Sequence, residues 1–239
     1  SPEQLKDFTA CLQNLSSDQL IIGIDQEGGK VNRLKKDYGF KESISMAKLG
    51  KLNDHKRTEI ESNKIVKTLK ECGINLNFSP VLDLLLSKEN VITQKDRAIS
   101  SNPNIISDHA RIIMNCHFKN NVIAVGKHFP GQGSSSGDTH EGWVDVTNSW
   151  SKKELIPYER LIDSEDIFAV MTSHLFNKNL DDKYPATISK KIINDLLRKE
   201  LNFDGVVISD DPQMKALSKK YTLKKLIELM INAGVDILC

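Results

Sequence analysis

Short apolar runs alternate with longer amphipathic stretches along the whole chain, and this alternation constrains the fold more than any other feature. The runs have the length of strands and lack polar alternation, which is typical of strands buried on both faces. They lie at residues 20–24, 74–78, 122–125, 167–171, 205–208 and 235–238. The sequence therefore predicts a buried strand at each of these places.

The stretches between these runs have the spacing of amphipathic helices. Apolar residues recur on one face of 54–72, and a second helix is predicted to begin at Pro103. Ser189 and Thr222 are predicted N-caps of two further helices. Strands joined by helical crossovers form parallel sheets, so we expect an α/β fold. A chain of 239 residues also matches the size of a TIM barrel, which is typically about 250 residues, and we expect one domain over 1–239.

The composition excludes several classes of protein. The 33 basic and 32 acidic side chains nearly cancel and leave a formal net charge of +1. This balance gives no general attraction to nucleic acid or to an anionic membrane. No apolar run approaches the ~18 residues of a membrane-spanning helix. The four cysteines form no C-x-x-C pair, so neither a zinc knuckle nor a redox motif is indicated.

Charged or imidazole side chains follow several of the predicted strands. They are Asp25 after the first run, Lys127 and His128 after the third, His174 after the fourth and Asp210 after the fifth. The carboxyl ends of parallel strands meet at one rim, where ligands bind in α/β folds. The sequence therefore predicts an active site built from several loops. The alternative is that such residues cap the following helices, which we favour for Asp211 because Pro212 suits the first helical position.

The segment 127–142 is rich in glycine and serine, which predicts a mobile loop. Asp138 and His140 lie two residues apart in it, and in extended backbone such residues project to the same side. Asp138 is therefore expected to orient the His140 imidazole as a general acid and base. A solvated polar loop without a catalytic role is the alternative.

Several of these segments together resemble glycoside hydrolase family 3, and within it the bacterial β-N-acetylglucosaminidase branch. The segments that carry the resemblance are IGIDQEGGKVNRL (22–34), GINLNFSPVLDL (73–84), KHFPG (127–131), DTH (138–140), VMTSH (170–174), PATIS (185–189) and GVVISDD (205–211) with Met214, and more weakly DRAIS (96–100). They follow one another in the order of the family across nearly the whole chain. The resemblance implies a TIM (β/α)8-type barrel with parallel strands.

The resemblance also implies roles for individual residues. Asp210 matches the nucleophile, His140 the acid/base and Asp138 the partner that orients it. The positions that match the N-acetylglucosamine-binding residues of the family are Asp25, Arg33, Arg97, Lys127 and His128. The implied activity is that of a retaining, exo-acting hydrolase, which removes terminal N-acetylglucosamine from peptidoglycan or chitin-type fragments through a covalent glycosyl-enzyme intermediate.

The implied partner is a small carbohydrate, and neither a cofactor nor a metal is expected. The resemblance leaves open a cytoplasmic or a periplasmic location in a bacterium, and the oligomeric state. Gln132 and Lys30 depart from the family, which usually has His and Arg at these positions. The family barrel has further strands before the first run, so we expect this chain to lack the first strands of the barrel.

Other interpretations of the same residues stay open. Another family 3 β-glycosidase or a glycoside phosphorylase would use a similar site, and a metal-dependent hydrolase or a non-catalytic sugar-binding barrel would be less consistent with it. Arg33 and Lys127 could form structural salt bridges to Asp25 or Glu27. His128 could be a packed imidazole, and His174 could line the pocket or pack beneath it.

Overall fold

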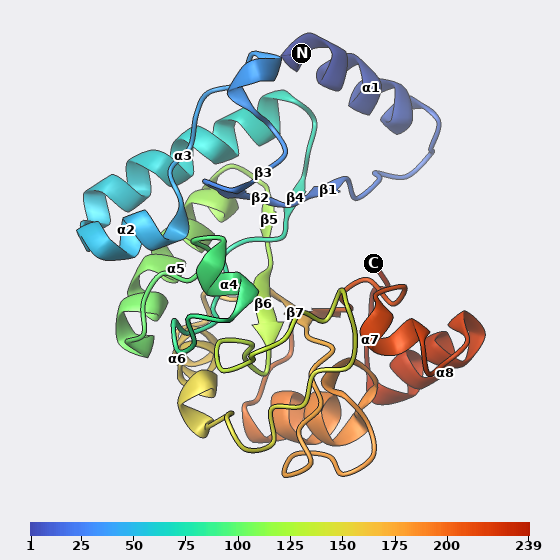
Figure 1. The fold of residues 1–239 in the computed structure, drawn as a ribbon. Helices are drawn as coiled ribbons and strands as arrows, with labels where there is room; N and C mark the ends of the chain where they lie inside the picture. The colour runs from blue at the N-terminus through green and yellow to red at the C-terminus, as the bar shows by residue number, and fades with distance from the viewer.

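The computed structural model describes all residues, 1–239, as an α/β fold with parallel sheets (Figure 1). The sheets have the orders β1-β4-β5 and β6-β7-β8, and every pair of neighbours in them is parallel. The strands are β1 (Gly23–Ile24), β4 (Leu76–Asn77), β5 (Ile123–Ala124), β6 (Gly126–Phe129), β7 (Ala169–Thr172) and β8 (Val206–Ile208).

The two parallel sheets continue into one another. A parallel bridge joins Val81, which follows β4, to Lys127 in β6. A second bridge joins Ile208 in β8 to Ile237. Each of the six predicted runs therefore contains a strand or a bridge, and the prediction of a parallel α/β arrangement is confirmed. The short antiparallel pair β2 (Gln26–Gly28) and β3 (Val31–Asn32) was not predicted. Nor was β6, so Lys127 and His128 lie within a strand and not after one as expected.

Helices connect the strands as expected. Asp54 caps α3 (His55–Glu71), Asn102 caps α5 (Pro103–Lys119) and Thr222 caps α8 (Leu223–Ala233). The Ser189 hydroxyl accepts the amide of Ile192 and so begins η4 (Lys191–Glu200), a helix of wider, π-type turns. The remaining helices are α1 (Pro2–Asn14), η1 (Lys36–Tyr38), α2 (Met46–Leu52), α4 (Val91–Gln94), η2 (Lys152–Leu155), α6 (Ile156–Asp163), η3 (Ala186–Ile188) and α7 (Lys215–Ser218).

The expected cap at Asp211 is wrong. Asp211 Oδ1 accepts the amide of Gln213 at 2.8 Å and its carbonyl accepts that of Met214, which closes a turn. The next helix, α7, begins only at Lys215. Asp211 and Pro212 therefore form a turn that directs the chain away from the end of β8.

Apolar side chains fill both sides of the strands. The largest cluster holds 27 buried residues and packs the strands against α5, α6, η4 and α8. Burying one large apolar side chain contributes roughly 1.5–3 kcal/mol, so this layer dominates the stability. A smaller cluster of Leu76, Val125, Ala169, Met171 and Ile208 lies on the strands themselves. It places the polar ends of the strands above an apolar floor.

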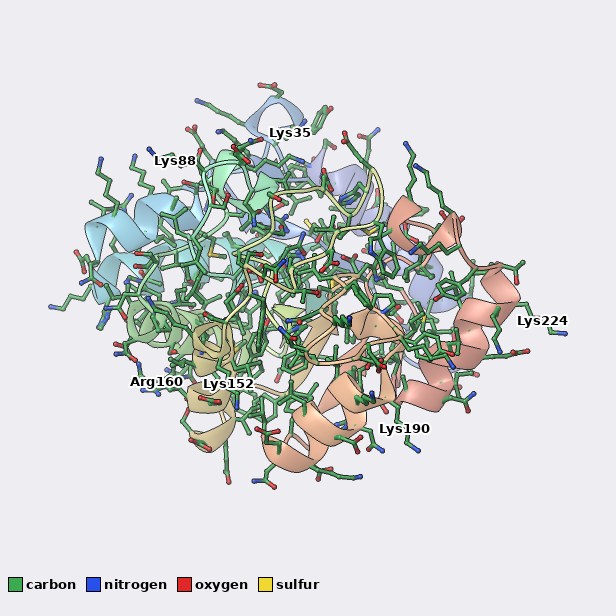
Figure 2. The ribbon with its side chains drawn as sticks, turned by 60° about the horizontal axis from the view of Figure 1, so that its bottom comes forward. Lys35, Lys88, Lys152, Arg160, Lys190 and Lys224 are labelled. Carbon is green, nitrogen blue, oxygen red and sulfur yellow. The ribbon has the colours of Figure 1, made fainter.

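The basic side chains are spread around the molecule. Figure 2 shows Lys35, Lys88, Lys152, Arg160, Lys190 and Lys224 pointing outward at separate places on its rim. No helix is both long and apolar enough to cross a bilayer.

Candidate active site

A pocket of about 520 Å³ opens at the carboxyl ends of the parallel strands. Of the predicted site residues, the pocket is lined by Asp25, Arg33, Arg97, Lys127, His128, His140 and Asp210. The eighth predicted residue, Asp138, lies directly behind His140. Segments that are more than a hundred residues apart in the sequence therefore meet in one cleft, as the rim argument predicted.

Lys127 is the centre of a buried charge network on one wall of this pocket. Its Nζ lies 2.8 Å from Asp25 Oδ1 and 2.8 Å from Glu27 Oε1, and its side chain is only 2% exposed. Arg97 donates two hydrogen bonds to the Glu27 carboxylate, from Nε at 2.8 Å and from Nη2 at 2.7 Å. Burial alone would raise the pKa of the Glu27 carboxyl, but Lys127 and Arg97 outweigh it and lower that pKa to about 2. We call this network, with Arg33, His128 and Asp83, the binding wall.

Asp25 belongs to the same wall but faces the pocket. Its carboxylate receives Lys127 on one oxygen and Arg33, at 3.3 Å, on the other. Its side chain is 37% exposed, so the lone pairs that remain point to solvent. Burial opposes ionisation of Asp25, but the Lys127 ammonium prevails and its pKa lies below the usual value. The salt-bridge alternative for Arg33 and Lys127 is thus correct as geometry, and both residues line the pocket as well.

A side-chain amide holds the backbone that presents Asp25 and Glu27. Asn77 in β4 accepts the amide of Gln26 on Oδ1 at 3.0 Å and donates from Nδ2 to the Gln26 carbonyl at 3.1 Å. Its Nδ2 also lies 3.0 Å from Nε2 of the buried His117. Gln26 in turn accepts the amides of Arg33 and Leu34. The two carboxylates on either side of Gln26 are therefore fixed from within the sheet.

His128 is held by a fully buried carboxylate. Its Nδ1 lies 2.6 Å from Asp83 Oδ2, and its backbone amide donates to Asp83 Oδ1 at 3.2 Å. Nε2 lies 3.4 Å from Nη2 of Arg97. The imidazole is thus packed, as one interpretation held, yet one edge of it lines the pocket.

Opposite the wall, His140 projects from a partly exposed segment, residues 136–143, which we call the flap; Thr139 in it is buried. Its Nδ1 lies 2.7 Å from Asp138 Oδ1, and its backbone amide donates to the same oxygen at 2.9 Å. The expected contact between Asp138 and His140 is confirmed. The backbone here is a turn, closed by Glu141 N–H donating to the Asp138 carbonyl at 3.0 Å, so the expected extended conformation is wrong.

The glycine- and serine-rich loop is not uniformly mobile. Residues 131–135, which we call the root, are buried. Asn90 donates to the carbonyls of Gln132 and Gly133, and Glu154 accepts the amide of Gly133 at 2.8 Å. Gly131 has φ +115°, and a side chain there would meet Glu154 Cβ at 2.5 Å. The glycines of the root thus allow close packing, so the prediction of a mobile loop is wrong for this half.

Asp210 follows β8 on the floor of the pocket. Its Oδ1 accepts the amide of Asp211 at 2.9 Å, and its other oxygen has no partner within the protein. His174 lies beneath: its Nε2 donates to the Asp211 carbonyl at 2.8 Å and its Nδ1 lies 2.8 Å from Thr187 Oγ1. Burial lowers the pKa of His174. Of the two interpretations of His174, packing under the pocket is therefore correct.

The sequence reasoning missed two members of the wall. Asp83 lies inside an apolar run, and Glu27 was considered only as a salt-bridge partner. Both are at most 1% exposed. A charge in an apolar run must be paired when buried, so Asp83 carried a usable signal for a polar partner nearby. The side chains form no group of three or more His, Cys, Asp or Glu placed to hold a metal ion.

Comparisons with known proteins identify several relatives of this chain. A β-hexosaminidase from Nitrosomonas eutropha is 35% identical over 99% of this chain and 69% of its own length. A solved glycoside hydrolase family 3 β-N-acetylglucosaminidase from Paenibacillus is 33% identical, with a TM-score of 0.92 over 99% of this chain and 46% of its own. NagZ from Neisseria gonorrhoeae, in complex with N-trifluoroacetyl-D-glucosamine, is 30% identical with a TM-score of 0.87 over 100% of this chain and 70% of its own.

This chain thus spans about two thirds of the length of the curated relatives and about half of the length of some solved structures. The model of the glycosyl hydrolase family 3 N-terminal domain matches residues 1–239. The chain therefore belongs to the glycosyl hydrolase family 3 N-terminal domain family.

Proposed function

We propose that this protein is a retaining, exo-acting β-N-acetylglucosaminidase, which cleaves terminal N-acetylglucosamine from peptidoglycan or chitin-type fragments. The observation that carries the proposal is one pocket that holds a free carboxylate, Asp210, and an imidazole, His140, opposite the binding wall. Relatives named β-hexosaminidase and a related structure with an N-acetylglucosamine analogue support it.

The first chemical step uses Asp210 as the nucleophile. Its unpartnered oxygen attacks C1 of the sugar and forms an ester bond, while the bond from C1 to the leaving oxygen breaks. Positive charge develops on the sugar in the transition state, and the carboxylate stabilises it. Protonated His140 gives its proton to the leaving oxygen.

The second step returns the enzyme to its starting state. His140, now neutral, takes a proton from a water molecule, whose oxygen attacks C1. The ester bond breaks and Asp210 is released as a carboxylate. Asp138 holds the proton on Nδ1 of His140, so that Nε2 is the atom that exchanges protons, and its charge stabilises the imidazolium.

The binding wall holds the sugar during both steps. Asp25 has lone pairs facing the pocket and accepts hydrogen bonds from sugar hydroxyls. Lys127, Arg33 and Arg97 supply donors and neutralise Asp25 and Glu27, so that the wall carries no large net charge against the sugar. His128 offers the edge of its ring.

The proposal includes the architecture. We propose that residues 1–239 act as a single catalytic domain of the TIM (β/α)8 type. Parallel strands with the site at their carboxyl ends are the features that support it.

Turnover of an aryl β-N-acetylglucosaminide by Asp210→Ala tests the nucleophile. We expect a loss of at least about 10³-fold, because alanine removes the oxygen that forms the bond to C1. Asp204→Ala, which removes an exposed carboxylate at the other end of β8, is the matched control and should keep full activity. Unchanged turnover in Asp210→Ala would overturn the assignment.

The products decide between related activities. Proton NMR should show the β-anomer of N-acetylglucosamine forming first, as retention requires. Release of a sugar phosphate when phosphate is added would instead identify a glycoside phosphorylase. Binding of sugar without any turnover would identify a non-catalytic sugar-binding protein.

A further inference from the structure

We propose that Lys220 and Trp143 form a latch that holds the flap closed over Asp210, and that both are positioning residues for the acid/base step. The proposal rests on the proposed function. Lys220 Nζ lies 3.0 Å from the centroid of the Trp143 indole ring. Lys220 follows α7 and Trp143 ends the flap, so this contact joins the segment behind Asp210 to the segment that carries His140 (Figure 1).

Two hydrogen bonds from the same segment reach the flap beside His140. The amide of Ala216 in α7 donates to the carbonyl of Thr139 at 3.1 Å. Lys219 Nζ donates to the carbonyl of Glu141 at 3.3 Å. The acceptors are the two residues that flank His140 in the chain. The region of α7 therefore contacts the flap at three positions around His140: Thr139, Glu141 and Trp143.

Both ends of the flap are anchored elsewhere, which leaves its centre dependent on the α7 region, through these two hydrogen bonds and the latch. The root is held by Asn90 and Glu154, as described above. Beyond the flap, the Val144 carbonyl accepts the amide of Phe176 at 2.9 Å, in the segment after β7. The Trp143 ring also packs on the Phe176 ring, with centroids 5.0 Å apart. The neighbouring Thr139 is buried, but the His140 side chain is 67% exposed and is not itself held by core packing.

The latch acts only through His140, which is the acid in the first step and the base in the second, and kcat/KM reports the first step alone. Asp210 lies on the floor beside β8 and does not depend on the flap for its position. Opening of the flap therefore leaves nucleophilic attack intact but removes the proton donor from the leaving oxygen. A good leaving group departs without a proton, whereas a poor one does not. Loss of the latch should thus slow substrates in proportion to the basicity of their leaving groups.

The kinetic test compares Lys220→Met with Lys224→Met. Lys224 is exposed on α8 and points outward in Figure 2, so it provides the same substitution without a contact to the flap. Exposed cation–π contacts correspond to a roughly two- to fivefold effect on an equilibrium. We expect Lys220→Met to lower kcat/KM by about this factor for phenyl β-N-acetylglucosaminide, and not for the dinitrophenyl substrate. Lys220→Arg should retain the rate, because guanidinium also stacks on indole.

Hydrogen exchange provides a second test, which does not depend on enzymatic activity. The Ala216 amide is bonded to the flap, so its hydrogen exchange reports flap docking directly. Lys220→Met should speed this exchange by a similar factor, and Lys224→Met should leave it unchanged. Equal slowing of good and poor leaving groups, or unchanged Ala216 exchange, would overturn the latch. An inactive wild type with faster Ala216 exchange in Lys220→Met would overturn the proposed function and keep the latch.

Discussion

The binding wall and the flap face each other across one pocket, but they are held in opposite ways. The wall is buried: Lys127 is 2% exposed and its two carboxylate partners are locked by further cations and by Asn77. The catalytic side chain of the flap, His140, is 67% exposed and is fixed by Asp138 alone. Binding a sugar needs a rigid set of donors, whereas a group that first gives and then takes a proton needs room and access to water.

Two buried carboxylates, one in the wall and one beneath the root, show how neighbouring charge decides the pKa of a buried acid. Glu27 in the wall is paired with two cations, which outweigh its burial and lower its pKa to about 2. Glu154 beneath the root forms no salt bridge, and burial raises its pKa to about 7 although it accepts two backbone amides. Similar burial thus leads to opposite pKa shifts, because only the wall supplies compensating charge.

The largest expected effect follows from removing the cation at the centre of the wall. Lys127→Met removes the buried cation that Asp25 and Glu27 share, so that Asp25 keeps only Arg33 and Glu27 keeps only Arg97. Breaking a buried ion pair typically costs about 3–5 kcal/mol. We expect urea unfolding to show a loss of this size, together with loss of activity. Lys152→Met, at an exposed lysine, should change the free energy of unfolding by less than about 0.5 kcal/mol.

A second substitution tests whether the stability lost in Lys127→Met comes from an uncompensated carboxylate in the wall. Adding Asp25→Asn to Lys127→Met removes the carboxylate that keeps only the exposed Arg33 as a partner, and should restore part of the lost stability. If the double variant is no more stable than Lys127→Met, the ion pairs are not what holds the wall together.

The sequence predicted the wall better than the flap, for a physical reason. Strand ends in a parallel sheet must meet at one rim, so periodicity alone brought Asp25, Lys127 and Asp210 together. The resemblance added Arg33 and Arg97, whose segments lie outside regular strands. Composition, however, treated the glycine-rich loop as one mobile unit. It could not show that the root packs so closely against Glu154 and Leu84 that Gly131 and Gly133 are required there.

Side-chain contacts between distant segments also could not be predicted from the sequence. Lys219 and Lys220 contact the flap, which lies about eighty residues earlier in the sequence, and neither segment has a periodic pattern. Asp83 was visible as a charge in an apolar run, but its partner, His128, was not. Side-chain pairing of this kind depends on loop conformation, which local propensity does not determine.

The carboxylate under the root predicts a pH dependence of stability. Because burial raises the pKa of Glu154 above its unfolded value, the folded state binds a proton more tightly than the unfolded state. Its contribution is therefore present below about pH 4.5 and is lost as the pH rises to about 7, in total about 3 kcal/mol. The groups that face it are Asp83, Ser134 and Tyr158.

Glu154→Gln tests this dependence, because glutamine keeps the shape and does not titrate. The free energy of unfolding, measured from pH 5 to pH 8, should fall less steeply in this variant than in the wild type. Glu200→Gln changes an exposed glutamate and should follow the wild-type curve. Parallel curves for Glu154→Gln and the wild type would show that the carboxylate beneath the root is already compensated.

The smallest of these three effects on the wall, the root and the flap concerns the flap. Asp138 resists ionisation through its partial burial, but its hydrogen bonds with His140 prevail and lower its pKa. Asp138→Asn keeps the size of the side chain but removes the charge that favours a proton on Nδ1 and stabilises the imidazolium. We expect about 10²-fold lower kcat, equivalent to about 2.7 kcal/mol, with the free energy of unfolding unchanged within about 0.5 kcal/mol. Glu141→Gln neutralises the neighbouring exposed carboxylate and should leave kcat intact. A loss of stability in Asp138→Asn as large as its loss of rate would mean that the flap, like the wall, is a structural element, and the contrast between the two sides of the pocket would disappear.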